Sequence, residues 1–202
     1  MPASDLVGQV ALVAGGGHGV GAAIARSLSA RGVAVVVTGR DEHALARVVG
    51  EIAASGGKAR HLAGDPEDPA HVRAAAEKAV SVFGGLQIVI VDASHSEDAG
   101  ITLDDIRSAA HVATSKMTGA GRLIAITNDA TNSKIVHMLR SLSTELASQK
   151  ITCNTICAGW VDLASKTRVE PEEVAEVAAF FCTRAADAIT AQGLTVGQAS
   201  SF

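Results

Sequence analysis

The stretch VALVAGGGHGVG, residues 10–21, decides the fold. Its first four residues predict a buried strand, glycines follow directly, and apolar periodicity from Val20 to Arg31 predicts a helix. A strand, a glycine turn and a helix in this order direct backbone N–H groups and a helix N-terminus at a phosphate. Gly15 allows the tight turn, Gly19 lets the backbone approach a pyrophosphate, and Gly21 lets helix and strand pack closely. The spacing G-x-x-x-G-x-G differs from the commoner G-x-G-x-x-G, and glycines alone would also fit a flexible turn, but the flanking elements favour a nucleotide site.

Composition excludes several classes of protein. The chain has 202 residues, 48% of them hydrophobic, which argues against disorder and suits one domain with a well-buried sheet. The net charge is -4 and no basic stripe is present, so we expect no nucleic-acid partner. No long apolar run precedes the first strand, so we expect neither a signal peptide nor a membrane span, and a cytoplasmic location is the default. The three cysteines lack metal-ligand spacing, and no metal site is expected.

Strand and helix patterns alternate along the whole chain. After the first pair, strands are expected at 33–38, 58–62, 88–91, 122–127, 151–157 and 193–196, and helices at 42–55, 69–83, 102–117, 133–148 and 171–183. Such alternation predicts a parallel sheet with right-handed crossovers and helices on both faces. We therefore predict an α/β fold, a single doubly wound Rossmann-type domain over residues 1–202 with a mainly parallel sheet of about seven strands. Ligands should bind outside the carboxyl ends of the strands.

With these elements in place, the chain resembles the short-chain dehydrogenase/reductase family, and the resemblance covers nearly all of it. The motifs that carry it are AGGGHGVG (14–21), TGR (38–40), GD (64–65), GRLIAIT (121–127), SLSTELASQKITCNTICAGW (141–160) and ITAQGLTV (189–196). Members of that family bind NAD or NADP and move hydride to or from a carbonyl or alcohol carbon. The resemblance therefore implies an oxidoreductase that acts on a carbonyl or alcohol substrate.

The resemblance implies NADP(H) rather than NAD(H) as the cofactor. Arg40 follows the second strand, where an acid would bind the ribose hydroxyls of NAD, and a guanidinium suits the 2′-phosphate of NADP. His18 matches a position that is often basic in NADP-preferring relatives, and Asp65 matches an aspartate near the adenine amino group. The alternatives are a solvated surface charge for Arg40 and turn initiation for Asp65. The residues expected to contact the cofactor are Gly15, Gly17, His18, Gly19, Val20, Gly21, Arg40, Gly64, Asp65 and Ala93.

The residues that carry the family's chemistry are largely missing. Relatives have a serine at the end of the fifth strand and Tyr-x-x-x-Lys about a dozen residues later, whereas this chain has no tyrosine. Asn128 takes the serine's place beside Thr127, Ala130 takes the tyrosine's, and Lys134 matches the lysine. The segment between the fifth strand and the next helix is shortened. In place of the family's NNAG, residues 91–94 read Val-Asp-Ala-Ser.

A substitute acid has to come from polar groups near the strand ends. His95 follows the fourth strand and could titrate near neutrality, and a His95–Asp129 pair would have the composition of an acid/base dyad. Lys134 could donate a proton or anchor the ribose, and Asp92 is a further carboxylate in this region. The alternative is that all of them are solvated loop residues. The candidate catalytic residues are Asn128, Lys134, His95 and Asp129.

Three classes of function fit this pattern. The first is an NADP(H)-dependent oxidoreductase with a rearranged acid, the second a nucleotide-binding regulatory protein or inactive partner subunit, and the third a non-redox cyclase, dehydratase or isomerase. A small-molecule substrate fits the first and the third. Relatives assemble through the helices after the fourth and fifth strands, so we expect a homo-oligomer (dimer or tetramer) or a hetero-oligomer with an active homologue. An apolar stripe is compatible with that contact, although packing on the chain's own sheet also explains it: Ile135, Leu139, Leu142 and Leu146.

Overall fold

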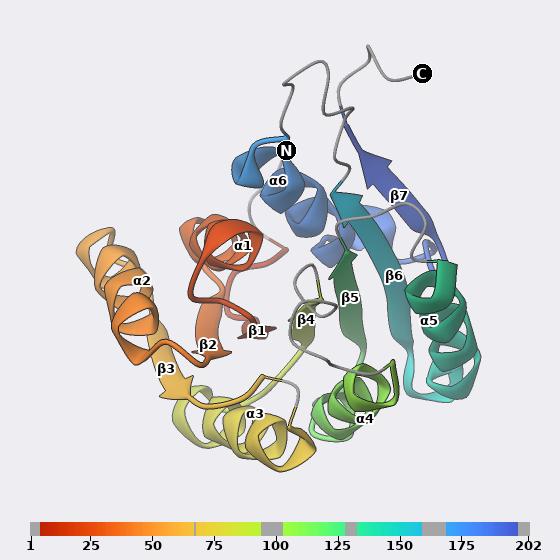
Figure 1. Cartoon of the computed structure of the whole chain (residues 1–202), viewed down its shortest axis with the longest axis horizontal. Coiled ribbons are helices and arrows are strands. Elements are labelled where there is room, and N and C mark those ends of the chain that lie inside the picture. Colours follow the sequence, from red (N-terminus) through yellow and green to blue (C-terminus); the bar gives the residue numbers. More distant parts are fainter. Residues whose placement is uncertain (1–4, 67, 94–102, 128–132, 159–168, 198–202) are drawn as a thin grey trace.

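The computed structural model describes residues 5–66, 68–93, 103–127, 133–158 and 169–197. Seven strands form one sheet, and helices lie on both of its faces (Figure 1). The strands are β1 (Val10–Ala14), β2 (Ala34–Gly39), β3 (Ala59–Ala63), β4 (Ile88–Asp92), β5 (Gly121–Thr127), β6 (Ile151–Ala158) and β7 (Gly193–Val196). The helices are α1 (Gly19–Ala30), α2 (Glu42–Ala54), α3 (Pro69–Phe83), α4 (Leu103–Thr114), α5 (Ser133–Glu145) and α6 (Pro171–Cys182), with short 3-10 helices η2 (Ala147–Gln149) and η3 (Arg184–Ala186).

All strands are parallel, in the order β3-β2-β1-β4-β5-β6-β7. The chain winds outward from β1 in one direction through β2 and β3, and then in the other direction from β4 to β7. This is the doubly wound α/β fold that the alternating sequence pattern predicts. The point where the winding reverses lies between β1 and β4, and such a point leaves a crevice at the carboxyl ends of the strands.

Two hydrophobic cores sandwich the sheet. Ala11 and Val13 of β1 face the core formed with α1, α2 and α6, whereas Val10 and Leu12 face the core formed with α3, α4 and α5. Figure 1 shows the same two layers of helices on opposite sides of the strands. Because both faces are covered, the central strands are apolar at nearly every position instead of alternating.

The apolar stripe of the fifth helix packs inside the chain. Ile135, Leu139, Leu142 and Leu146 are at most 2% exposed and belong to the core beneath α4 and α5. The outward sides of these two helices are polar, and Arg107 of α4 forms an ion pair of 2.6 Å with Glu145 of α5. The stripe therefore gives no support to a contact between subunits, and oligomerisation stays a prediction.

Two predicted helices extend three residues beyond the observed ends. The helix expected to reach residue 117 ends at Thr114, whose hydroxyl donates to the carbonyl of His111, and turns follow it. The helix expected to reach residue 148 ends at Glu145, and its continuation tightens into η2 before Lys150 takes a left-handed conformation (φ 59°). Side-chain competition for the last carbonyls and a tightened final turn are common ways for a helix to end.

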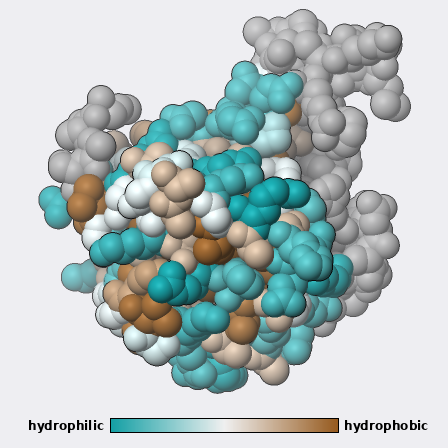
Figure 2. Space-filling view, turned by 90° about the vertical axis from the view of Figure 1, so that its left-hand side faces the viewer, coloured by the Kyte–Doolittle hydropathy of each residue, from teal (hydrophilic) through white to brown (hydrophobic). Residues whose placement is uncertain are grey.

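The edge of the sheet at β3 is protected by charged side chains. The ammonium group of Lys78 donates to the carbonyl of His61 over 2.9 Å, and Arg60 occupies the neighbouring position on the strand. Figure 2 views the side of the molecule that carries α2 and β3, where hydrophobic residues are scattered among hydrophilic ones. Charges of this kind discourage a further strand from pairing with an open edge. Within the described residues no helix is long and apolar enough to cross a membrane.

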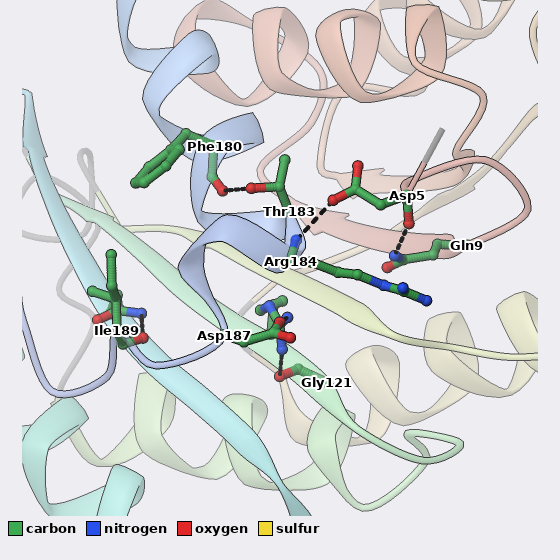
Figure 3. Close-up of polar contacts among 10 residues, drawn as sticks. Asp5, Gln9, Gly121, Phe180, Thr183, Arg184, Asp187 and Ile189 are labelled. Atoms are coloured by element: carbon green, nitrogen blue, oxygen red, sulfur yellow. Dashed lines mark hydrogen bonds and ion pairs between the residues drawn. The ribbon is translucent and has the colours of Figure 1, made fainter. Parts of the chain in front are cut away.

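Polar contacts fasten the segment after α6 to the start of the chain and to β5 (Figure 3). Asp5 accepts a hydrogen bond from the backbone N–H of Arg184 over 2.8 Å. Asp187 pairs with the guanidinium of Arg122, whose side chain is only 12% exposed. The nearby Cys182 is buried, and burial raises the pKa of its thiol to about 12, so it acts as a core residue. Arg122 is the least exposed side chain in any of the described ion pairs, whereas its partner Asp187 is 60% exposed.

We expect Asp187→Ala to lower the free energy of unfolding by about 1–2 kcal/mol, because the mostly buried guanidinium of Arg122 would lose its only carboxylate in this cluster. The measurement is urea denaturation followed by circular dichroism. The matched control is Glu145→Ala, which breaks the pair with Arg107 whose side chains are 47% and 39% exposed. That control should cost at most about 0.5 kcal/mol. Equal losses in the two variants would contradict the argument from burial.

Candidate functional site

A pocket of about 240 Å³ opens at the carboxyl ends of β1, β2 and β4, at the reversal of the winding. The loop from β1 to α1, the end of β2, the turn from β3 to α3 and the end of β4 all contribute to it. Its lining consists of Gly15, Gly17, His18, Gly39, Arg40, Asp41, Pro66 and Asp92. The sequence predicts a ligand site at this place, and the fold provides a pocket there.

The glycine loop is folded tightly against its neighbours. Gly15 has φ +89°, a conformation that favours glycine, and the backbone N–H groups of Gly15 and Gly16 both donate to the carbonyl of Thr38 (2.9 and 3.1 Å). A Cβ on Gly21 would lie 2.3 Å from the carbonyl oxygen of Gly15. The turn and the close packing therefore depend on the glycines, as the sequence predicts. A Cβ on Gly19 would meet no atom within 4 Å, so the backbone faces open space there.

The first turn of α1 begins at this loop without a side-chain cap. His18 occupies the N-cap position, but its side chain makes no capping hydrogen bond. A helix N-terminus carries N–H groups without intrahelical partners and a partial positive charge, both of which favour an anion. The imidazole of His18 turns instead to Asp41, with 3.3 Å between Nε2 and Oδ2.

Each of the two basic residues of the pocket has a carboxylate partner. The Nη2 atom of Arg40 lies 3.1 and 3.2 Å from the carboxylate oxygens of Asp65, and the two side chains are 54% and 47% exposed. Asp41 pairs with His18 and also accepts a hydrogen bond of 3.0 Å from the backbone N–H of Ala44, which caps α2. That backbone bond, helped by His18, lowers the pKa of the Asp41 carboxyl. Exposed pairs contribute little to stability, so an incoming anion can replace a carboxylate at small cost.

Asp92 places a carboxylate beside the glycine loop and the first turn of α1. It ends β4 and is half-buried, and a Cβ on Gly15 would lie 2.8 Å from its Cβ. Its Oδ2 would lie 3.3 Å from a Cβ on Gly21 in the first turn of α1. A negative charge here interacts favourably with the partial positive charge of the helix N-terminus. It also repels a second negative group at the same place. Asp92 is therefore positioned to weaken the binding of a diphosphate.

The structure brings only some of the predicted cofactor residues into the pocket. Gly15, Gly17, His18 and Arg40 line it, and Gly19 and Gly21 open the adjoining helix. Asp65 flanks the pocket through its pair with Arg40, and Gly64 donates its N–H to the carbonyl of Gly39, which lines the pocket. Val20 packs against the core, and Ala93 is 3% exposed with its N–H bonded to the carbonyl of Ile126. Their contact with a cofactor stays a prediction.

Sequence reasoning missed Gly39, Asp41 and Pro66, which also line the pocket. A signal for Asp41 was available, because an aspartate directly before a helical pattern is a typical N-cap. The pair between Asp41 and His18 joins residues 23 positions apart and leaves no sequence signal. Pro66 enters the pocket through the turn that follows β3.

The candidate catalytic residues are mostly beyond what the structure describes. His95, Asn128 and Asp129 lie outside the described residues, so the proposed His95–Asp129 dyad stays a prediction. Lys134 is described in the first turn of α5, where it is exposed. Among the described parts of the chain, no group of three or more His, Cys, Asp or Glu side chains is placed to hold a metal ion.

The family model for short chain dehydrogenases matches residues 9–126, more than half of the chain. The chain belongs to the short-chain dehydrogenase family. The match begins at β1 and ends within β5, before the segment in which the family carries its serine and tyrosine.

Individual relatives agree with this membership. Versicolorin reductase stcU of Emericella nidulans is 32% identical over 193 positions, covering 79% of this chain and 72% of the relative. The alignment is 193 positions long but covers only 79% of the 202 residues of this chain. The remaining positions are gaps in this chain, so the relative has segments that this chain lacks. The short-chain reductase protein NovJ of Streptomyces niveus is 31% identical, with 76% of this chain and 69% of NovJ covered.

Solved structures share the fold. A short chain dehydrogenase from Burkholderia cenocepacia, determined in complex with NADP, superimposes with a TM-score of 0.79 and 27% identity over 96% of this chain and 98% of that one. A hydroxysteroid dehydrogenase from Escherichia coli gives a TM-score of 0.85 at 23% identity, covering 96% and 97% of the two chains. The family binds nicotinamide cofactors.

We expect the carboxyl of Asp41 to titrate with a pKa below its ordinary value of 3.8, because the Ala44 N–H and His18 both stabilise the carboxylate. Carbon-detected NMR across an acid titration measures this value. The stability that Asp41 contributes is present above the unfolded pKa and is lost as the pH falls through the lowered folded pKa. His18→Ala should raise the pKa of Asp41 only part of the way, since the backbone bond remains. An unchanged midpoint in that variant would refute the contribution of His18.

Proposed function

We propose that this chain binds NADP(H), with the adenosine end in the pocket between the glycine loop and Arg40. The single observation that carries the proposal is the arrangement of three features around one pocket. These are a glycine loop with open space above Gly19, a helix N-terminus without a side-chain cap, and the exposed guanidinium of Arg40 at the end of β2. The NADP in the similar Burkholderia cenocepacia protein supports the same assignment.

The residues present suit a dinucleotide phosphate. The first turn of α1 would hold the diphosphate, and Arg40 would bind the 2′-phosphate with charge-assisted hydrogen bonds. The Arg40–Asp65 pair is roughly half-exposed, so a phosphate can compete with Asp65 for the guanidinium. When bound, the cofactor supplies or accepts a hydride at its nicotinamide ring. An acidic residue at position 40 would instead favour the free ribose hydroxyls of NAD(H).

We propose further that the chain cannot use the family's proton relay. The sequence contains no tyrosine, and Ala130 stands at the position that the resemblance assigns to it. A positioned general acid contributes about 10²–10⁴ to a rate, and an oxyanion donor about 10²–10³. As an oxidoreductase acting on a carbonyl or alcohol, the chain would depend on His95, Asp129 or Lys134 for the proton.

A second candidate function is nucleotide binding without turnover, as a redox sensor or as the partner of an active homologue. The observation that favours it is the position at which the family match stops. Residues 9–126 contain the whole adenosine side of the proposed site. The match ends before the segment in which the family carries its catalytic serine and tyrosine. The two candidates share the cofactor and differ only in turnover, so separate measurements of binding and turnover distinguish them.

Calorimetry on the purified chain should show tighter binding of NADPH than of NADH. Arg40→Ala should weaken NADPH about 10- to 100-fold, because a charge-assisted contact with the 2′-phosphate is lost, and should leave NADH nearly unchanged. Asp92→Asn is the matched control. It removes a charge beside the diphosphate that both cofactors carry, so it should tighten both by a similar factor of about five. Failure of the unchanged chain to bind either cofactor would overturn the proposal, and an equal loss of both in Arg40→Ala would overturn the role of Arg40.

With saturating NADPH, a panel of aldehydes and ketones should be reduced at least about 10⁴-fold more slowly than by a family member with the complete serine, tyrosine and lysine set. The loss of nicotinamide absorbance measures the rate. Where turnover is found, one of His95→Ala, Asp129→Ala and Lys134→Ala should abolish it, whereas Lys58→Ala, before β3, should not. Binding without any turnover would favour the second candidate. Rapid turnover that survives all three substitutions would contradict both.

A further inference from the structure

Thr38 connects the glycine loop with two other segments near the pocket. It lies near the carboxyl end of β2 and is fully buried, and its carbonyl accepts hydrogen bonds from Gly15 and Gly16 of the loop. Its hydroxyl lies 2.8 Å from the carbonyl of Leu62 in β3, and it also contacts Nε2 of His71 in α3. One buried threonine thus joins the loop after β1 to β3 and to the first turn of α3.

The hydrogen-bond chemistry fixes the direction of these contacts. A threonine hydroxyl has one proton, and the carbonyl of Leu62 can only accept, so that proton goes to Leu62. The hydroxyl oxygen then accepts from His71, which requires a proton on Nε2 of the imidazole. The pair joins residues 33 positions apart. Its geometry therefore depends on one protonated ring nitrogen of His71.

The ring of His71 also sets the path of the backbone toward the pocket. A Cβ on Gly64 would lie 2.3 Å from Nδ1 and Cε1 of that ring, so the imidazole covers the Cα of this glycine. Gly64 has φ +157° and donates its N–H to the carbonyl of Gly39 over 2.9 Å. The next residue is Asp65, which holds Arg40. The imidazole therefore fixes the backbone at Gly64, and this in turn fixes the position of the neighbouring Asp65 in its ion pair with Arg40.

We propose that His71 is a positioning residue for the 2′-phosphate end of the cofactor. By donating to Thr38 it keeps the turn from β3 to α3 in register with the glycine loop, and so keeps Asp65 where it orients Arg40. Neither Thr38 nor His71 lines the pocket. The proposal rests on the proposed binding of NADP(H) and adds that selectivity for the 2′-phosphate depends on a residue that does not touch it.

The test uses two fragments of the cofactor, 2′,5′-ADP and 5′-AMP, which differ by the 2′-phosphate, with calorimetry on the full chain. His71→Phe and Thr38→Val remove the hydrogen bond and keep the approximate shape. Each should weaken 2′,5′-ADP about tenfold and 5′-AMP much less. His71→Gln keeps an Nε2 donor and Thr38→Ser keeps the hydroxyl, so these conservative variants should bind within about threefold of the unchanged chain. His71→Phe combined with Thr38→Val should lose no more than Thr38→Val alone, because Thr38→Val already breaks the contact with His71 together with the hydrogen bond to Leu62.

His111→Phe is the matched control, since this histidine is exposed on α4 and should leave both affinities unchanged. Thermal unfolding of each variant separates a loss of folding from a loss of selectivity, because a merely unfolded fraction weakens both fragments equally. Should the variants not fold, the nitrogen chemical shifts of the His71 imidazole in the unchanged chain decide the matter. A proton on Nε2 supports the proposal, and a bare Nε2 overturns it.

The outcomes separate this inference from the proposed function. Binding of 2′,5′-ADP by the unchanged chain, with an unaltered ratio of the two affinities in His71→Phe and Thr38→Val, would overturn the positioning role alone. An equal loss of both fragments in folded variants would do the same. No binding of 2′,5′-ADP, NADPH or NADH by the unchanged chain would overturn the proposed function, and the positioning role with it.

Discussion

The turn after β1 has no room for side chains at Gly15 and Gly16, and the rest of the site depends on that constraint. A Cβ on Gly15 would meet Asp92 of β4 at 2.8 Å, one on Gly16 would meet Val37 of β2 at 2.8 Å, and one on Gly21 would meet the loop itself. The turn is therefore wedged between the two strands that flank β1, at the point where the winding of the sheet reverses. Because a side chain at Gly15 or Gly16 would push a strand aside, and one at Gly21 would push the loop aside, the loop and the sheet fix each other.

The electrostatics of the pocket follow from what this wedge brings together. The helix terminus and Arg40 attract an anion, whereas Asp41, Asp65 and Asp92 oppose one. Asp41 and Asp65 are exposed and form ion pairs with His18 and Arg40. Because exposed ion pairs contribute little to stability, a phosphate can replace either carboxylate at little cost. Asp92 differs, because it is half-buried and packed against the glycines. Its carboxylate lies at the first turn of α1, where a negative charge opposes the approach of a second one.

Much of the fold could be predicted because its signals are local. Apolar runs and glycine turns alternate, and this alternation was enough to predict the doubly wound sheet and the place of Arg40 at the end of β2. The helix boundaries at Thr114 and Glu145 depend on hydrogen bonds in the last turns, which an apolar pattern does not report. The stripe through Ile135 and Leu139 fitted two kinds of packing, and only the fold shows that its own sheet covers it.

The partners within the site could not be predicted, because they meet across the sheet. Arg40 and Asp65 are 25 positions apart, and Thr38 and His71 are 33 apart, and neither pair has a spacing that recurs in helices or strands. Such contacts exist only once parallel strands have brought their carboxyl ends to one edge. The same reason limits inference about the candidate acids His95 and Asp129, which lie outside the described residues.

The division of the site between the two ends of the ligand has a simple physical basis. In the proposed site, the adenosine end needs backbone N–H groups, one guanidinium and a tight turn, which β1, β2, the turn after β3 and the end of β4 would supply. The reacting end needs a proton donor held within hydrogen-bond reach of the substrate, and in this family that donor comes from the segment after β5. The described strands β1 to β4 all precede that segment in the chain. A chain of this kind can therefore keep an affinity for the cofactor while losing the rate that depends on the acid, because the two properties depend on different parts of the fold.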